Sequence, residues 1–325
     1  MGRAVAHADA RVADKSPTAH SVRFASMGNT AFVTVIADDD ETGERLLERS
    51  RGWAASLEAR WSRFIPTSDV SRLNTARGRA VRISPDTEVL IRHLLSAHDV
   101  TNGHFDPFVL PALLAAGYTT SFAGDARTSC PASAPESRSS RRNVVIESID
   151  GSTWCRLLEG ATLDPGGLGK GLAADIIAER LIMEGALGAL VSMGGDIRCI
   201  GASPDPAGWV VDIEALSHPA MGASTVVLRS GAIATSSTFA KRWHAGHHVI
   251  DPTTGRPTDE ASHDALRMSS VIASTAVWAE VFATACIVAG ADRAAELVET
   301  HGLAARFERT NGIPVCTSNF GRYRS

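Results

Sequence analysis

A glycine-rich stretch near the middle of the chain combines residue types that could bind a phosphorylated ligand. It covers residues 163–171 and contains Asp164, four glycines and Lys170. Glycines at the start of a helix let backbone N–H groups approach a phosphate, and the positive end of the helix dipole favours its charge. Lys170 adds a mobile cation and Asp164 an oxygen donor. The stretch matches neither the Walker A motif nor the glycine spacing of a Rossmann turn. The alternative to a phosphate site is therefore a structural glycine-rich turn with an incidental lysine.

A carboxylate and a hydroxyl stand four residues apart in a largely apolar segment, residues 276–290, that predicts a buried helix ending at glycine. Glu280 and Thr284 would project from one face of that helix. Buried polar groups need partners, and Mg²⁺ prefers oxygen ligands of this kind. A hydrogen bond between the two side chains in the core explains the pair equally well.

Two adjacent histidines, His247 and His248, precede a turn-forming run that starts at Asp251. Neighbouring side chains on a strand point to opposite faces, so at most one histidine is expected to face a site. Met27 stands beside a strand-like segment, residues 31–37. A methionine in such a place more often fills a gap in the core.

Hydrophobic periodicity predicts the elements that would position these residues. Ser68 with Asp69 offers cap chemistry for a short helix, and a longer helix ends at Asn102-Gly103. Gly194 and Gly195 interrupt a predicted strand and suggest a bulge or a close approach of backbone or ligand. The other predictions are helices over residues 41–61 and 85–101, a helix after the glycine-rich stretch, and strands over 143–148, 152–158, and 189–193 continuing at 197–201.

The length permits one large domain or two smaller ones. Residues 1–20 lack an apolar period and are interpreted as a flexible tail. Residues 119–142, rich in Ser, Ala, Thr and Arg, are interpreted as a surface insertion within a domain over residues 21–320.

The amino-acid composition argues against some classes of binding partner and favours one cellular compartment. The net charge of −4 argues against a nucleic-acid partner held by a broad basic surface. Five scattered cysteines favour a reducing compartment over a disulfide framework or a zinc site. The N-terminus lacks a signal-like pattern, and no apolar run is long enough to span a bilayer. We expect a cytoplasmic protein with no membrane partner.

In their order along the chain, several of these segments together resemble the ApbE family, the FAD:protein FMN transferases. The resemblance extends over roughly residues 22–300, as its first and last segments show. The matching segments are residues 27–30, 62–74, 103–107, 164–175, 194–196, 234–236, 248–255 and 279–284.

The resemblance implies a single α+β domain, with mixed or antiparallel sheets and flanking helices, that holds FAD in an extended cleft. It implies a reaction in which FMN moves from FAD to a Thr or Ser hydroxyl of a target flavoprotein, with release of AMP. Met27 would pack against the flavin ring. The other residues implied to contact the nucleotide are Phe64, Phe105, Asp106, Pro107, Asp164, Lys170 and His248.

The resemblance also implies a metal site and a catalytic group. Gly167 falls where a backbone carbonyl binds Mg²⁺, with Glu280 and Thr284 as side-chain ligands. The family usually has Asp where this chain has Glu280, so an extra methylene must fit the octahedral geometry that Mg²⁺ demands. Lys170 would stabilise charge on the phosphates, and His248 would orient or deprotonate the acceptor hydroxyl. The catalytic candidates are His248, Lys170 and Asp251.

Two other functions fit the same residues. Water could replace the protein hydroxyl, which would make the chain an FAD pyrophosphatase that yields FMN and AMP. The chain could also be a flavin-binding protein without catalysis, if Glu280 impairs the metal. An acceptor with a Ser/Thr-Gly-Ala-Thr/Ser type of target sequence would distinguish a transferase from a hydrolase.

Overall fold

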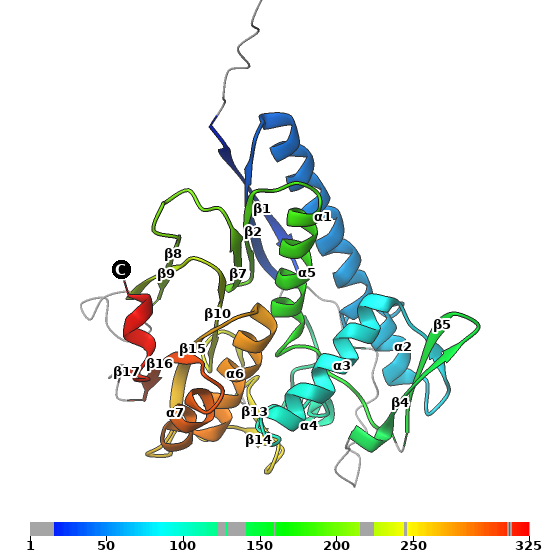
Figure 1. Cartoon of the computed structure of the whole chain (residues 1–325). Coiled ribbons are helices and arrows are strands. Elements are labelled where there is room, and N and C mark those ends of the chain that lie inside the picture. The colour runs from blue at the N-terminus through cyan, green and yellow to red at the C-terminus, as the bar shows by residue number, and fades with distance from the viewer. Residues whose placement is uncertain are drawn as a thin grey trace, which may run out of the picture.

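The structure is a computed structural model of the whole chain (Figure 1). It describes residues 16–121, 128, 141–158, 160–214, 224–243, 246–310, 312 and 314–324. Residues 1–15, and most of the expected insertion over 119–142, lie outside the described residues.

An eight-stranded sheet forms the centre of the fold, and every pair of neighbouring strands in it is antiparallel. Apolar side chains alternate between its two faces, as the pleat of a strand requires. Val191 in β6 faces the larger core, for example, while the preceding Leu190 faces the smaller one. In spatial order the strands are β1 (Thr18–Ser26), β2 (Asn29–Ala37), β6 (Gly188–Met193), β7 (Asp196–Gly201), β10 (Gly231–Ser237), β15 (Leu266–Ala273), β16 (Ala304–Arg309) and β17 (Pro314–Cys316).

Helices on one face of the sheet supply the larger core (Figure 1). Their apolar stripes meet the inward side chains of the strands, which removes both surfaces from water. These helices are α1 (Asp40–Trp61), α5 (Gly169–Met183), α6 (Ala276–Ala289) and α7 (Ala291–Glu299). The opposite face is covered by a hairpin of β8 (Trp209–Ile213) and β9 (Ser224–Leu228), together with the 3₁₀ helix η3 (Phe320–Tyr323).

A third group of elements packs beside the helices and carries residues of the later site. Its sheet, β3-β5-β4, extends away from the central sheet in Figure 1. The elements are α2 (Asp69–Thr75), β3 (Val81–Arg82), α3 (Pro85–Val100), α4 (Leu110–Ala115), the 3₁₀ helix η1 (Arg141–Asn143), β4 (Val144–Ile149) and β5 (Ser152–Leu157). Two short hairpins complete the fold: β11 (Arg242–Trp243) with β12 (Gly246–His247), and β13 (Ile250–Asp251) with β14 (Arg256–Pro257).

The expected α+β class and the main helices are confirmed, and two expectations need correction. Strand β1 begins at Thr18, inside the stretch that we had interpreted as a tail. Gly194 and Gly195 do not form a bulge in one strand. They have φ angles of 64° and 97° and make the two-residue turn of the hairpin β6–β7. Two adjacent residues with positive φ are typical of such hairpin turns, and only glycine adopts both without strain.

Helices α5 and α6 cross at very close range, and this crossing fixes the start of both helices. A Cβ atom built on Gly171 would lie 2.3 Å from the backbone oxygen of Ala276. The Asp175 carboxylate of α5 accepts hydrogen bonds from the N–H groups of Ala276 and Val277, each at 2.8 Å. Because α6 receives no cap from its own Thr275 side chain, Asp175 satisfies its first free N–H groups from the neighbouring helix.

Among the residues that the structure describes, no helix has the length and apolar content needed to cross a membrane. Cys155, Cys199 and Cys286 are buried free thiols, and burial raises the pKa of each to about 12.

The close crossing predicts opposite effects for two glycine-to-alanine substitutions in helices. Gly171→Ala should lower the free energy of unfolding by about 1–3 kcal/mol, because the added methyl group meets the α6 backbone. Gly52→Ala in α1, where nothing lies within 4 Å of the new Cβ, should raise it by about 0.5–1 kcal/mol. Urea unfolding of both variants measures the difference. Equal effects would show that α5 and α6 are not in such close contact.

Candidate active site

A cavity of about 350 Å³ lies among the glycine-rich turn, the loop after α1, the first turn of α5 and the side of α6 that carries Glu280, Thr284 and Val288. The candidate residues that line it are Met27, Phe64, Phe105, Asp106, Asp164, Gly167, Lys170, His248, Glu280 and Thr284. Two candidates do not line it, Pro107 and Asp251. Pro107 supports the wall, because its carbonyl accepts a hydrogen bond of 2.8 Å from the N–H of Asp164. The Asp251 carboxylate accepts hydrogen bonds from the N–H and hydroxyl of Thr253 and so stabilises its own turn.

Met27 reaches the cavity from the turn between β1 and β2. Its φ angle is 50°, a left-handed conformation that is uncommon for a residue with a side chain. The next residue, Gly28, has a φ of 70°, and both line the cavity. The turn therefore gives the cavity a flexible apolar side chain, which is partly buried and also packs against the larger core.

Hydrogen bonds to Asn74 of α2 and within the turn itself hold the glycine-rich turn in place before α5 begins. The Asn74 side-chain amide donates to the carbonyl of Leu163 at 2.9 Å and accepts from its N–H at 2.8 Å. The Asp164 carboxylate accepts a hydrogen bond of 3.2 Å from the N–H of Gly166. These contacts fix the backbone of the turn, so that Asp164 and Gly167 face the cavity rather than solvent.

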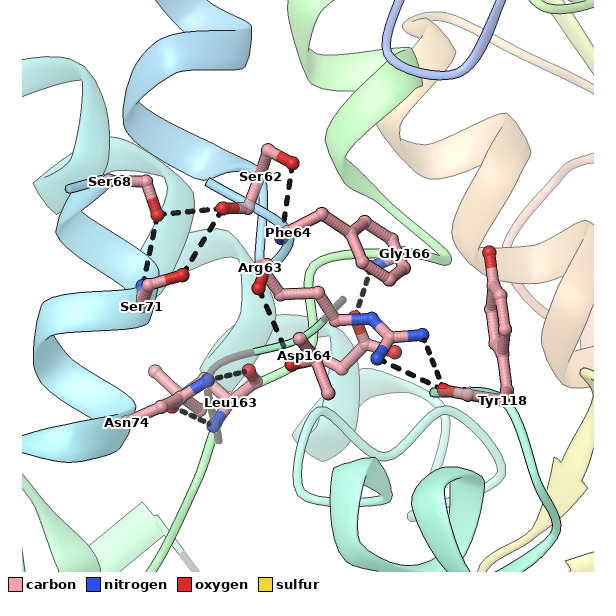
Figure 2. A network of polar contacts seen from close by, with 11 residues as sticks. Ser62, Arg63, Phe64, Ser68, Ser71, Asn74, Tyr118, Leu163, Asp164 and Gly166 are labelled. Atoms are coloured by element: carbon pink, nitrogen blue, oxygen red, sulfur yellow. Dashed lines mark hydrogen bonds and ion pairs between the residues drawn. The ribbon is translucent and has the colours of Figure 1, made fainter. Parts of the chain in front are cut away.

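Arg63 joins this turn to an aromatic wall (Figure 2). Its guanidinium lies over the ring of Phe64 at 4.3 Å and over that of Tyr118 at 4.4 Å. The guanidinium donates two hydrogen bonds of 3.3 Å to the Tyr118 carbonyl, and its Nε is 3.7 Å from Asp164 Oδ1. Phe64 was expected at the site, whereas the roles of Arg63 and Tyr118 were missed.

The loop that carries Arg63 and Phe64 is shaped by serine hydroxyls, as Figure 2 shows. The Ser68 hydroxyl donates to the carbonyl of Ser62 at 2.7 Å and accepts from the N–H of Ser71 at 3.0 Å. The cap of α2 that the sequence predicted therefore also anchors the preceding loop.

Lys170 lies between two buried carboxylates. Its Nζ is 2.5 Å from Asp196 Oδ2 and forms a second ion pair with Glu280. The other oxygen of Glu280 accepts a hydrogen bond of 2.7 Å from the N–H of Gly171. Both carboxylate side chains are 3% exposed, and when both are ionised the cluster of one cation and two anions carries a net charge of −1 away from water. Asp196, like Arg63 and Tyr118, was not among the site residues expected from the sequence.

Burial and neighbouring charges shift the pKa values in this cluster in opposite directions. Burial lowers the pKa of Lys170, but Asp196 and Glu280 outweigh it and hold the pKa above its usual value. Burial, together with the charge of Glu280, raises the pKa of Asp196 to about 7 in spite of Lys170. The lysine stays protonated at neutral pH, and its charge is already balanced inside the protein.

Oxygen donors for a metal gather next to this cluster. Thr284 Oγ1 is 2.9 Å from Ser236 Oγ, and a Cβ atom built on Gly167 would lie 3.6 Å from Thr284 Oγ1. With Glu280 these groups form an all-oxygen set beside a net negative charge, which suits Mg²⁺. Only one carboxylate belongs to the set, and the described residues contain no group of three or more His, Cys, Asp or Glu placed to hold a metal.

The hairpin β11–β12 brings His248 and Lys241 together. Lys241 directly precedes the hairpin and His248 directly follows it, and the N–H of His248 donates to the Lys241 carbonyl at 3.2 Å. Both side chains line the cavity. The neighbouring His247 does not line it and accepts a hydrogen bond from the N–H of Val249 in the core. One histidine therefore faces the cavity, as strand geometry predicted.

The imidazole of His248 is neutral at physiological pH. Burial, followed by the charge of Lys241, lowers its pKa to about 3. Its Nδ1 atom is buried and has no hydrogen-bond partner among the described residues. A neutral imidazole with a free nitrogen in a cavity can accept a proton from a bound ligand.

The fold and the site define a class of α+β protein with a ligand-sized cavity beside a glycine-rich turn at the start of a helix. Comparison with known proteins identifies the family. The sequence model of the ApbE family matches residues 27–307. The FAD:protein FMN transferase of Haemophilus influenzae is 26% identical over 296 residues, which cover 86% of this chain and 83% of that protein. The chain belongs to the ApbE family.

Solved structures show the same fold. The apo flavinyl transferase ApbE of Pseudomonas stutzeri superimposes with a TM-score of 0.77 at 23% identity, covering 94% of this chain and 96% of that one. The ApbE protein of Thermotoga maritima superimposes with a TM-score of 0.78 at 21% identity, covering 95% and 100%. The single α+β domain expected from the sequence is thus shared with these structures.

The low pKa of the partly buried His248 predicts a pH-dependent difference in stability between wild type and His248→Gln. The unfolded His248 takes up a proton below its ordinary pKa of 6.5, whereas the folded one does so only near 3. The wild type should therefore lose stability relative to the variant as pH falls through 6.5, by at most about 1.4 kcal/mol per pH unit.

Urea unfolding of both proteins, at pH values between about 7.5 and about 5, measures this difference because the other titrating groups are common to both. A constant difference across this range would contradict a buried, neutral His248.

Proposed function

We propose that the chain is a Mg²⁺-dependent FAD:protein FMN transferase. It moves FMN from FAD to a Ser or Thr hydroxyl of a target flavoprotein and releases AMP. The family membership, the activity named for the Haemophilus influenzae relative and the fold shared with flavinyl transferases support this reaction. The proposal includes a cytoplasmic address and an acceptor with a Ser/Thr-Gly-Ala-Thr/Ser type of target sequence.

One observation carries the proposal: the neutral imidazole of His248, with an unpartnered Nδ1, shares a cavity with the cation Lys241 and with oxygen donors suited to a metal that would neutralise a diphosphate. His248 accepts the proton of the acceptor hydroxyl. The hydroxyl oxygen then bonds to the phosphorus of the FMN half, the bond from that phosphorus to the bridging oxygen breaks, and AMP leaves with the bond electrons. Positioning and charge stabilisation, rather than covalent help from the protein, suffice for such a transfer.

The low pKa of His248 belongs to the protein without substrate. Burial is its largest cause, and the positive charges of Lys241 and Lys170 add to it. An anionic diphosphate bound beside Lys241 would offset positive charge near His248 and raise the pKa of His248 from its value without substrate, in the direction that a general base requires. Substrate binding and activation of the base are coupled in this way.

Three oxygen donors at the site have the chemistry that Mg²⁺ requires. The carbonyl of Gly167, the carboxylate of Glu280 and the hydroxyl of Thr284 would hold Mg²⁺. When bound, Mg²⁺ supplies charge neutralisation for the diphosphate. The longer side chain of Glu280 reaches Lys170 and the N–H of Gly171 at once, so both of its oxygens already have partners. Glu280 would have to share or release Lys170 to bind the metal.

The flavin and its phosphates would bind along the rest of the wall. Met27 at the rim would contact the flavin ring, and Phe64 and Phe105 would enclose the nucleotide. Asp106 and Asp164 provide oxygen acceptors, and the Asp106 carboxylate also accepts a hydrogen bond of 2.8 Å from the N–H of Phe108.

Mass spectrometry of an acceptor domain incubated with the protein, FAD and Mg²⁺ tests the function. The expected result is the gain of one FMN on the acceptor, formation of AMP, and loss of both in EDTA. His248→Gln should reduce the transfer rate by about 100-fold or more while FAD stays bound, because a general base contributes about 10²–10⁴.

Other outcomes identify the alternatives. Free FMN and AMP without a modified acceptor would make the chain an FAD pyrophosphatase, and bound FAD without any product would make it a flavin-binding protein. Transfer by His248→Gln at the native rate would remove the role of this histidine.

A further inference from the structure

Three cationic side chains line the cavity, and two of them are already balanced by carboxylates. Lys170 is held between Asp196 and Glu280, so that this part of the site carries a net negative charge. The guanidinium of Arg63 is engaged by Asp164 and by the aromatic rings on either side of it. A phosphate approaching either cation would also approach the carboxylate paired with it, which would repel the phosphate.

The third cation, Lys241, differs from these two. Its ammonium has no hydrogen bond or ion pair within the described part of the chain, and its Nζ lies 6.0 Å from the ring centroid of Tyr118. Burial, followed by the charge of Lys170, lowers its pKa, and the opposing charges of Asp164 and Glu280 do not offset this decrease. A half-buried cation facing a cavity is costly unless an anion joins it.

A lysine at position 241 is unusual, because most basic residues of this chain are arginines. Only three of its 32 basic residues are lysines, and two of the three, Lys170 and Lys241, line the cavity. Lysine is a compact point charge on a flexible stem, whereas arginine forms planar forks that pair with carboxylates. A point charge suits a diphosphate whose oxygens change position during transfer.

We propose that Lys241, rather than Lys170, is the residue that binds the diphosphate of the dinucleotide through its ammonium group. The inference deepens the proposed function and rests on it. Lys241 is also next to His248 through the hydrogen bond that closes the hairpin, so the diphosphate is held beside the proposed base. Lys170 then keeps Glu280 and Asp196 in place and does not contact phosphate.

Amine labelling of the wild-type protein tests the contact without any acceptor or metal. With three lysines in the chain, acetylation by an amine-selective reagent can be followed at each by peptide mass spectrometry, with Lys15 as the internal reference. FAD, ADP and inorganic pyrophosphate should each protect Lys241, whereas riboflavin and adenosine should not. Equal protection by riboflavin, or phosphate-dependent protection of Lys170 in place of Lys241, would overturn the proposal.

Dissociation constants for FAD and riboflavin provide the second measurement. Lys241→Met should weaken FAD binding by about 10- to 100-fold, the effect of losing a hydrogen bond to a charged group, and leave riboflavin binding unchanged. Lys241→Arg should recover part of the loss. Arg82→Met, which removes an exposed charge outside the cavity, is the matched control and should bind both ligands normally.

These readouts separate the inference from the function on which it rests. If Lys241→Met weakens both ligands equally, or neither, Lys241 does not bind the diphosphate, whatever the transfer assay shows. If the wild type fails to modify an acceptor while Lys241→Met still loses FAD selectively, the contact stands and the transferase proposal fails.

Discussion

The ion cluster of Lys170, Asp196 and Glu280 is the interaction on which the site depends. It joins the start of α5, the first residue of β7 and the second turn of α6, three segments that are not adjacent in sequence. Two carboxylates that are 3% exposed are costly to bury without the lysine, since desolvation strongly disfavours buried charge. The cluster therefore fixes the geometry of the part of the cavity formed by Lys170 and Glu280, here called the floor. It also gives this floor a net negative charge.

The negative charge of this cluster gives the charged groups around the cavity different roles. A net negative floor favours a divalent cation near Glu280 and disfavours direct contact between Lys170 and phosphate. The uncompensated positive charge of Lys241 lies across the hairpin from His248 instead. The close crossing at Gly171 allows this arrangement, because it brings the N–H of Gly171 within hydrogen-bond distance of Glu280.

Local patterns in the sequence predicted the elements well, and long-range partners could not be read from it. The helix over residues 41–61 followed from its apolar period and was found as α1. The turn at Gly194 was misread because a bulge and a hairpin turn share the same glycine signature, and only strand pairing distinguishes them. The partners of Lys170 lie 26 and 110 residues away, and Lys241 sits in no recognisable motif, so only the fold reveals what surrounds each lysine.

Urea unfolding of Lys170→Met beside the triple variant Lys170→Met, Asp196→Asn, Glu280→Gln tests the central claim most directly. If the lysine balances two buried carboxylates, removing it alone should cost about 3–5 kcal/mol, since both anions lose their partner. The triple variant should be more stable than the single one, because neutral amides of the same shape remove the uncompensated charge. A loss below about 1 kcal/mol for Lys170→Met, as for an exposed ion pair, would contradict the account, as would a triple variant that is less stable still.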